Sequence, residues 1–251
     1  MHVHLPKALH GWRELLKEIG IIVLGVLIAL SAEQAVESIH WYQRAANARE
    51  LLKRETHLHY LSDVERVVVL PCLEAQLDAI EQQVLAAGSV MKPLPIVRDQ
   101  GVSYVYRAPH RPWDDSAWRS VIADGISPYL SADERRMLPV LYQGLGTMRE
   151  NNQAEYAFGG RLMALAHPIP LDPQVKAQIV EDIEGERARA EAMALTARQT
   201  LSGVAAIHYQ PDKQMMDEYL QRSGTVRLCR QRGLPIAAPP RQMRPPRYLN
   251  L

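Results

Sequence analysis

The sequence predicts an all-α protein: an N-terminal transmembrane helix continuing into a periplasmic helical bundle, followed by an extended Pro/Arg-rich C-terminal arm. Three observations predict it: an uncharged apolar run over residues 19–32, helical spacing of apolar residues through most of the chain, and a proline-rich C-terminal end. We expect a short cytoplasmic tail over 1–18, an anchor helix over 19–40, a helical domain over 41–234 and the arm over 235–251.

The apolar run is short for a membrane span, and its flanks complete it. Residues 19–32 give about 21 Å of helix, whereas a span normally takes about 20 residues. Apolar residues on both sides lengthen it, and the helix from Trp12 to Trp41 measures about 43 Å. That length matches a bilayer with its polar interfaces, where tryptophan and tyrosine concentrate. We assign to the anchor Trp12, Ile19, Gly25, Ala29, Leu30, Trp41 and Tyr42.

Three other interpretations compete with an anchor. A secretory signal could be cut at the small residues 29–32, but the long leading segment carries Glu14 and Glu18, which suit an amphipathic helix better. A buried core helix does not explain aromatic residues at that separation. A helix lying flat on the membrane needs a polar face, and residues 19–30 carry no charge on any side.

The basic residues do not decide the orientation, because they stand on both sides of the anchor. Long domains are exported largely regardless of charge, and a short N-terminal tail rarely is. We therefore expect the tail in the cytoplasm and the domain in the periplasm of a bacterial inner membrane. Gly25 and Ala29 form a small-xxx-small pair, which predicts a homo-oligomer formed through the anchor helix.

Beyond the anchor, the helix is expected to continue to residue 70 and a second helix to run from Cys72 to Gly88. A proline-broken connector follows, with one short strand over 102–106. Residues 114–125 predict a short helix with an aspartate cap and a glycine stop.

Two later helix starts carry clear capping chemistry. Ser131 and Glu134 form a capping box, and Pro139 within that helix predicts a kink. Asp172 caps a helix whose first residue is a proline, and the apolar spacing carries this helix to Tyr209.

Charge and cysteine content limit the function. The chain has 29 basic and 28 acidic residues, a balance that argues against nucleic-acid binding. Cys72 and Cys229 are too far apart in sequence for a metal-type pair. In an oxidising periplasm such a pair favours a disulfide; the alternative is two small buried apolar side chains.

Two segments and the isolated cysteines resemble a known kind of protein. Residues 11–34, GWRELLKEIGIIVLGVLIALSAEQ, and residues 116–142, SAWRSVIADGISPYLSADERRMLPVLY, look like a family of uncharacterised bacterial single-pass membrane proteins. Those proteins have a short tail, a glycine-containing anchor and a helical outer domain. The resemblance implies an uncleaved anchor here, and it implies no catalytic residue.

Signatures of catalysis are missing from the sequence. No nucleophile elbow, P-loop or dinucleotide fingerprint is present, and we predict a non-enzymatic protein without cofactor or metal. We expect an accessory, assembly or scaffold subunit of an inner-membrane complex. The alternative is a membrane-anchored periplasmic enzyme or a small-ligand or metal-binding protein. Its site would be built from Glu55, His59 and Asp63, which share a helix face, and from His110 and Asp114.

Overall fold

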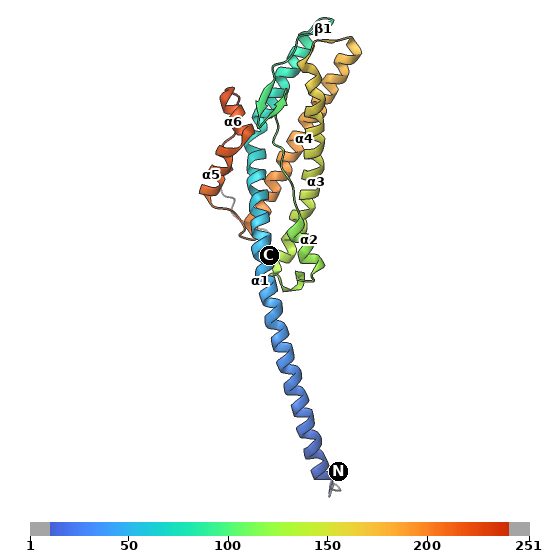
Figure 1. Cartoon of the computed structure of the whole chain (residues 1–251), viewed down its shortest axis with the longest axis vertical. Helices are drawn as coiled ribbons and strands as arrows, with labels where there is room; N and C mark the ends of the chain where they lie inside the picture. Colours follow the sequence, from blue (N-terminus) through green and yellow to red (C-terminus); the bar gives the residue numbers. More distant parts are fainter. Residues whose placement is uncertain (1–10, 241–251) are drawn as a thin grey trace.

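The computed structural model describes residues 11–240, and this part of the chain is mostly helical. Helix α1 (Trp12–Ala86) has 75 residues, which gives a length of about 110 Å. Its N-terminal part projects from the other elements, which gather around its C-terminal part (Figure 1). We call residues 41–240 the helical body. Its other helices are α2 (Ser116–Ala123), α3 (Ala132–Leu162), α4 (Pro173–Ala206), α5 (Lys213–Arg222), α6 (Gly224–Gln231), and the 3-10 turns η1 (Ser127–Tyr129) and η2 (Met163–Ala166).

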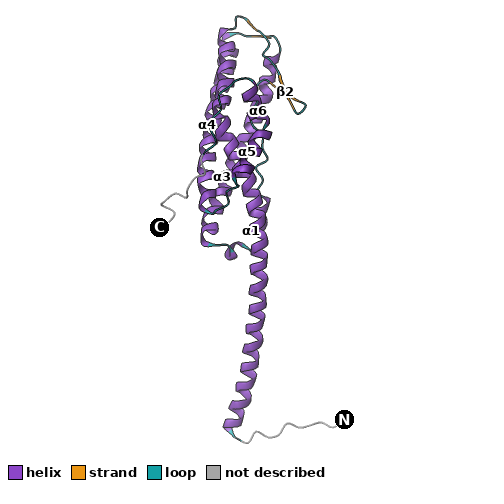
Figure 2. Ribbon diagram, turned by 90° about the vertical axis from the view of Figure 1, so that its left-hand side faces the viewer, coloured by secondary structure: helices purple, strands orange, loops and turns teal. Residues whose placement is uncertain are grey.

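The middle of α1 is the centre of the helical body. Helix α4 packs along both α1 and α3, and α5 and α6 lie on a different side of α1 (Figures 1 and 2). Residues 59–69 of α1 are consequently buried on every face of the helix. A helix enclosed on all sides must bury its polar side chains as well, and each of these needs partners inside the protein.

The capping signals located two helices correctly. The Ser131 hydroxyl accepts from the Glu134 N–H at 3.2 Å, and the Glu134 carboxylate accepts from the Ser131 N–H at 2.7 Å. Asp172 accepts from the Val175 N–H at 2.8 Å at the start of α4. Helix α3 runs through Pro139 without ending, so the kink at this residue stays a prediction.

The expected helix break at Pro71 is wrong. Helix α1 continues through Pro71 to Ala86, and residues 72–88 are therefore not a second helix. Proline removes one backbone hydrogen bond from a helix interior, while burial of the preceding turns holds the helix in place. The C-terminal arm also binds here, because the Ala237 N–H donates to the Val68 carbonyl at 2.8 Å.

Little of the chain forms strands. β1 (Val90–Met91) pairs with β4 (Ile169–Pro170), and β2 (Val97–Asp99) forms an antiparallel hairpin with β3 (Val102–Tyr104). The strand expected over 102–106 is confirmed for its first three residues.

After β3 the chain runs extended along the helical body without a strand partner, and side chains bond to its backbone. Gln76 accepts from the Arg107 N–H at 3.0 Å, and Arg66 donates to the Pro109 carbonyl at 3.3 Å. Arg149 donates to the Trp113 carbonyl at 2.6 and 2.8 Å. These contacts explain how a partly buried extended segment avoids unpaired backbone groups.

Helices α5 and α6 were not expected from the sequence, although both begin at a capping side chain. Asp212 accepts from the Met215 N–H at 2.8 Å, and Ser223 accepts from the Val226 N–H at 3.1 Å. After α6, residues 235–240 of the expected arm form neither helix nor strand, and Ile236 packs against the core; their extended conformation stays a prediction. The rest of the expected arm, 241–251, and residues 1–10 of the expected tail lie outside the described residues.

Candidate functional site

The exposed part of α1 is a large apolar surface. Every residue from 16 to 40 is exposed, and Trp12 and Ile21 retain 73% and 72% of their accessible surface. An apolar window in this helix has the length and composition of a membrane span, and 0% of it is buried. Soluble proteins rarely expose a continuous apolar surface of this size, and no other part of residues 11–240 covers it.

The assigned anchor residues all lie on this one helix. Trp12, Gly25 and Ala29 are exposed, and a side chain added at Gly25 would meet nothing within 4 Å. At the other end Tyr42 is exposed and Trp41 is half-buried, because Trp41 lies where the helical body begins.

A groove of about 980 Å³ lies beside α1, between its residues 51–59 and the segment leading into α2. The groove brings together four of the five residues considered for a periplasmic site: Glu55, His59, His110 and Asp114. Exposed Leu51 and Leu58 also line it.

The Glu55 and Asp114 carboxylates of the groove are bonded to the protein's own groups. The Glu55 carboxylate accepts from the Tyr142 hydroxyl at 2.6 Å and from the Ala117 N–H at 2.9 Å. Asp114 accepts from the N–H groups of Asp115 and Ser116 at 2.9 and 3.2 Å, whereas the N-cap residue of α2, Asp115, makes no side-chain capping hydrogen bond. A carboxylate committed in this way has little capacity left for a ligand.

His59 behaves as a packing residue. Its ring lies 6.1 Å from the Trp113 ring and 6.2 Å from the Tyr142 ring. Burial lowers its pKa to about 4, which keeps the imidazole neutral near pH 7. Among residues 11–240, no three His, Cys, Asp or Glu side chains are arranged to hold a metal ion.

Asp63 does not reach the groove. Each step of four residues turns a helix about 40° past a full turn, so Asp63 is rotated about 80° from Glu55. This rotation carries it into the helical body, where it is fully buried. Neither carboxylate oxygen of Asp63 has a hydrogen-bond partner in the described part of the chain. Burial raises the pKa of Asp63 well above its usual value.

Asp63→Asn is expected to stabilise the protein at pH 7 and not at pH 4. Burial lets the folded chain keep the Asp63 proton to a higher pH than the unfolded chain, which releases it above about pH 4. The free energy of unfolding therefore falls with rising pH, by about 1.4 kcal/mol per pH unit, until the folded pKa is passed. Urea unfolding of the full chain in detergent at both pH values measures the difference.

Glu150→Gln is the control for that substitution, because Glu150 is exposed and its replacement should leave the pH dependence unchanged. Equal stability differences between Asp63→Asn and the native chain at pH 4 and pH 7 would contradict the account of Asp63.

Two ion pairs, one buried and one partly buried, connect α1 to other segments. Arg66 donates to both oxygens of Glu155 on α3, at 2.7 and 2.6 Å, and both side chains are 2% exposed. The adjacent residue, Glu65, accepts from Arg111 at 2.6 and 2.7 Å. It also accepts from the hydroxyl of Ser223, which precedes α6. Partners so distant in sequence leave no local signal, which is why the sequence did not reveal these pairs.

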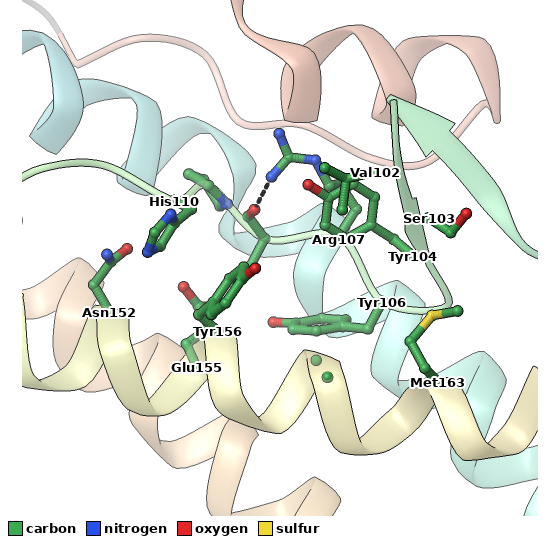
Figure 3. Close-up of a pocket in the computed structure, with 14 residues that line it drawn as sticks. Val102, Ser103, Tyr104, Tyr106, Arg107, His110, Asn152, Glu155, Tyr156 and Met163 are labelled. Atoms are coloured by element: carbon green, nitrogen blue, oxygen red, sulfur yellow. Dashed lines mark hydrogen bonds between the residues drawn. The ribbon is translucent and has the colours of Figure 1, made fainter. Parts of the chain in front are cut away.

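A small pocket of about 120 Å³ lies between residues 102–110 and α3, and Glu155 is one of the residues that line it (Figure 3). Its walls include Tyr104, Tyr106 and Tyr156. The His110 ring stacks on Tyr156 with the ring centres 4.5 Å apart. Within the described residues the buried Tyr106 hydroxyl has no hydrogen-bond partner, and burial raises its pKa well above the usual value. Aromatic rings form part of the pocket wall, and sequence reasoning did not find this pocket.

Cys72 and Cys229 form a disulfide between α1 and α6, with their Cα atoms 6.0 Å apart. Both side chains are fully buried. This agrees with the pairing expected from the sequence, although the bond lies in the interior of α1 and not at the start of a separate helix.

Comparisons with known proteins do not extend this description. No protein-family model matches the chain, and no curated protein or solved structure is significantly similar to it. The resemblance to a family of single-pass membrane proteins therefore stays an expectation.

Proposed function

We propose that this protein is a non-enzymatic, single-pass membrane protein that serves as an accessory, assembly or scaffold subunit of an inner-membrane complex. Its anchor is residues 19–40 of α1, and its helical body lies in the periplasm. The observation that carries the proposal is the fully exposed apolar segment, continuous in one helix with a folded body. A disulfide in that body supports an oxidising compartment.

An interaction role is supported by how the polar groups are used. The carboxylates of the groove bond to the protein's own N–H and O–H groups, whereas Leu51 and Leu58 remain exposed beside them. A surface of exposed apolar residues, in which the carboxylates are already bonded within the protein, suits contact with another protein better than catalysis. The groove is therefore the candidate surface for a partner subunit.

Gentle detergent extraction followed by native mass measurement tests this proposal. We expect the chain to be recovered with a stoichiometric membrane partner, and substitution of Leu51 and Leu58 by serine to weaken that association. Substitution of exposed Leu195, on α4, is the matched control. A lone monomer that binds Zn²⁺ tightly would contradict the accessory-subunit proposal.

One observation favours the alternative, a periplasmic enzyme or a small-ligand or metal-binding protein. The groove is large enough for a small molecule and places Glu55, His59, His110 and Asp114 around one space. Zinc titration of the full chain distinguishes the two functions, because this alternative predicts binding that the substitution His59→Ala abolishes.

Self-association through the anchor is a separate prediction. Gly25→Leu adds bulk at the position where two helices would approach most closely. The substitution should lower helix–helix association in a membrane reporter assay, and Val23→Leu is the control. An unchanged signal for Gly25→Leu would mean that the anchor acts only as a tether.

A further inference from the structure

The anchor and the helical body meet at one level of α1. Ala45 and Ala48 are buried, and all residues from 16 to 40 are exposed. Trp41 is half-buried and lies at the boundary between the exposed segment of α1 and its buried segment. The elements beside Trp41 are therefore the part of the body closest to whatever surrounds the anchor.

A segment distant in sequence is held against Trp41. The Tyr129 ring stacks on the Trp41 ring, with centres 4.9 Å apart and planes 3° from parallel. Arg49 donates to the Tyr129 carbonyl at 2.8 Å and pairs with Glu134 at 3.1 Å. These contacts fix the end of η1 beside α1.

The residues from 122 to 129, which we call the tip loop, comprise the last turn of α2, the connection after it and η1, at the anchor-proximal end of the body. Figure 1 shows this green segment as the part of the body nearest the projecting half of α1. Ile122 and Pro128 are exposed, and Tyr129 is half-buried. Beside them the exposed Arg44 guanidinium lies 5.1 Å from the centre of the Trp41 ring. Aromatic, apolar and arginine side chains together are typical of the layer between lipid and water.

The length of α1 brings this surface to the level of the headgroups. From Trp12 to Trp41 the helix covers about 43 Å, and a bilayer with its polar regions is about 40–45 Å thick. With Trp12 in one interface, Trp41 and the tip loop stacked on it lie in the other.

We propose that the tip loop, Trp41 and Arg44 form a second membrane contact that rests on phospholipid headgroups of the periplasmic leaflet. This inference rests on the proposed anchor. Its consequence is that the helical body has a fixed orientation on the membrane, so the groove stands at a constant height and faces a constant direction. A partner subunit in the same membrane would then meet a surface that is already oriented.

Site-specific quenching in nanodiscs of phosphatidylcholine and phosphatidylglycerol tests the contact. Because Cys72 and Cys229 are joined, one added cysteine can be labelled selectively with a fluorophore on the full chain. Three variants are compared: Ala123→Cys in the tip loop, Gln174→Cys near the start of α4, and Val26→Cys in the anchor. All three positions are exposed. The quencher is a nitroxide carried either on the lipid headgroup or in the middle of the acyl chain.

We expect headgroup nitroxide to quench the Ala123→Cys label several-fold more than the Gln174→Cys label, and acyl-chain nitroxide to quench Val26→Cys most strongly. Equal, weak quenching of Ala123→Cys and Gln174→Cys, with Val26→Cys quenched from the acyl chain, would overturn the second contact and leave the anchor intact. If neither the headgroup nitroxide nor the acyl-chain nitroxide quenched the Val26→Cys label, the anchor and the contact would both be rejected.

Discussion

Arg66→Ala is expected to lower the free energy of unfolding by about 3–5 kcal/mol, because it leaves buried carboxylates without their cation. Glu155 loses both of its hydrogen bonds to Arg66. Glu186 lies near Glu155, and burial together with that neighbour already raises the pKa of Glu186 to about 8. Urea unfolding of the full chain in detergent, followed by tryptophan fluorescence, measures the loss.

Two further variants test whether the lost stability comes from the Arg66–Glu155 ion pair. Lys213→Ala removes the partner of Asp217 on α5, where the side chains are 78% and 42% exposed; such a pair contributes about 1 kcal/mol or less. The double substitution Arg66→Met and Glu155→Leu should recover much of the stability lost in Arg66→Ala, because it leaves no buried charge unpaired. A single Arg66→Ala variant as stable as Lys213→Ala would contradict the assigned role of the pair.

Removing the disulfide is expected to lower the free energy of unfolding by about 2–4 kcal/mol. The bond closes a chain segment whose ends are 157 residues apart, so its loss gives the unfolded chain more conformational freedom. The double substitution Cys72→Ala and Cys229→Ala should also loosen α6 from α1. Limited proteolysis would then cut the α5–α6 region of the variant sooner than in the native chain.

Thiol labelling provides the control for that experiment. The denatured, unreduced native chain should contain no reactive thiol, and the reduced chain should contain two. Two reactive thiols without reduction would exclude the disulfide and weaken the periplasmic location.

The parts of the fold that depend on local hydrogen bonds could be predicted from the sequence. The caps at Ser131 and Asp172 located two helix starts, since a side chain and an N–H three residues apart settle each of them. Pro71 misled the prediction because its local cost is small beside the burial of the helix around it. At such positions tertiary packing, and not the local sequence, determines whether the helix continues.

The candidate site was predictable only in part, for a geometric reason. Glu55 and His59 line the groove as their helical spacing indicates, but the rotation of the helix carries Asp63 into the core. The pairing of Arg66 with Glu155, and the stacking of Trp41 on Tyr129, depend on how α1 packs against distant segments. No pattern within one segment encodes those contacts.

The most direct test of the central claim is the fate of the full chain in membranes. Alkaline-washed membranes and protease-treated spheroplasts are analysed by mass spectrometry. We predict an intact, membrane-bound chain after the wash. Protease acting from the periplasmic side should digest the helical body and leave a membrane-protected fragment that contains residues 19–40. A chain released by the wash, or a mature N-terminus beginning near Glu33, would show that this segment is not an anchor and would contradict the account.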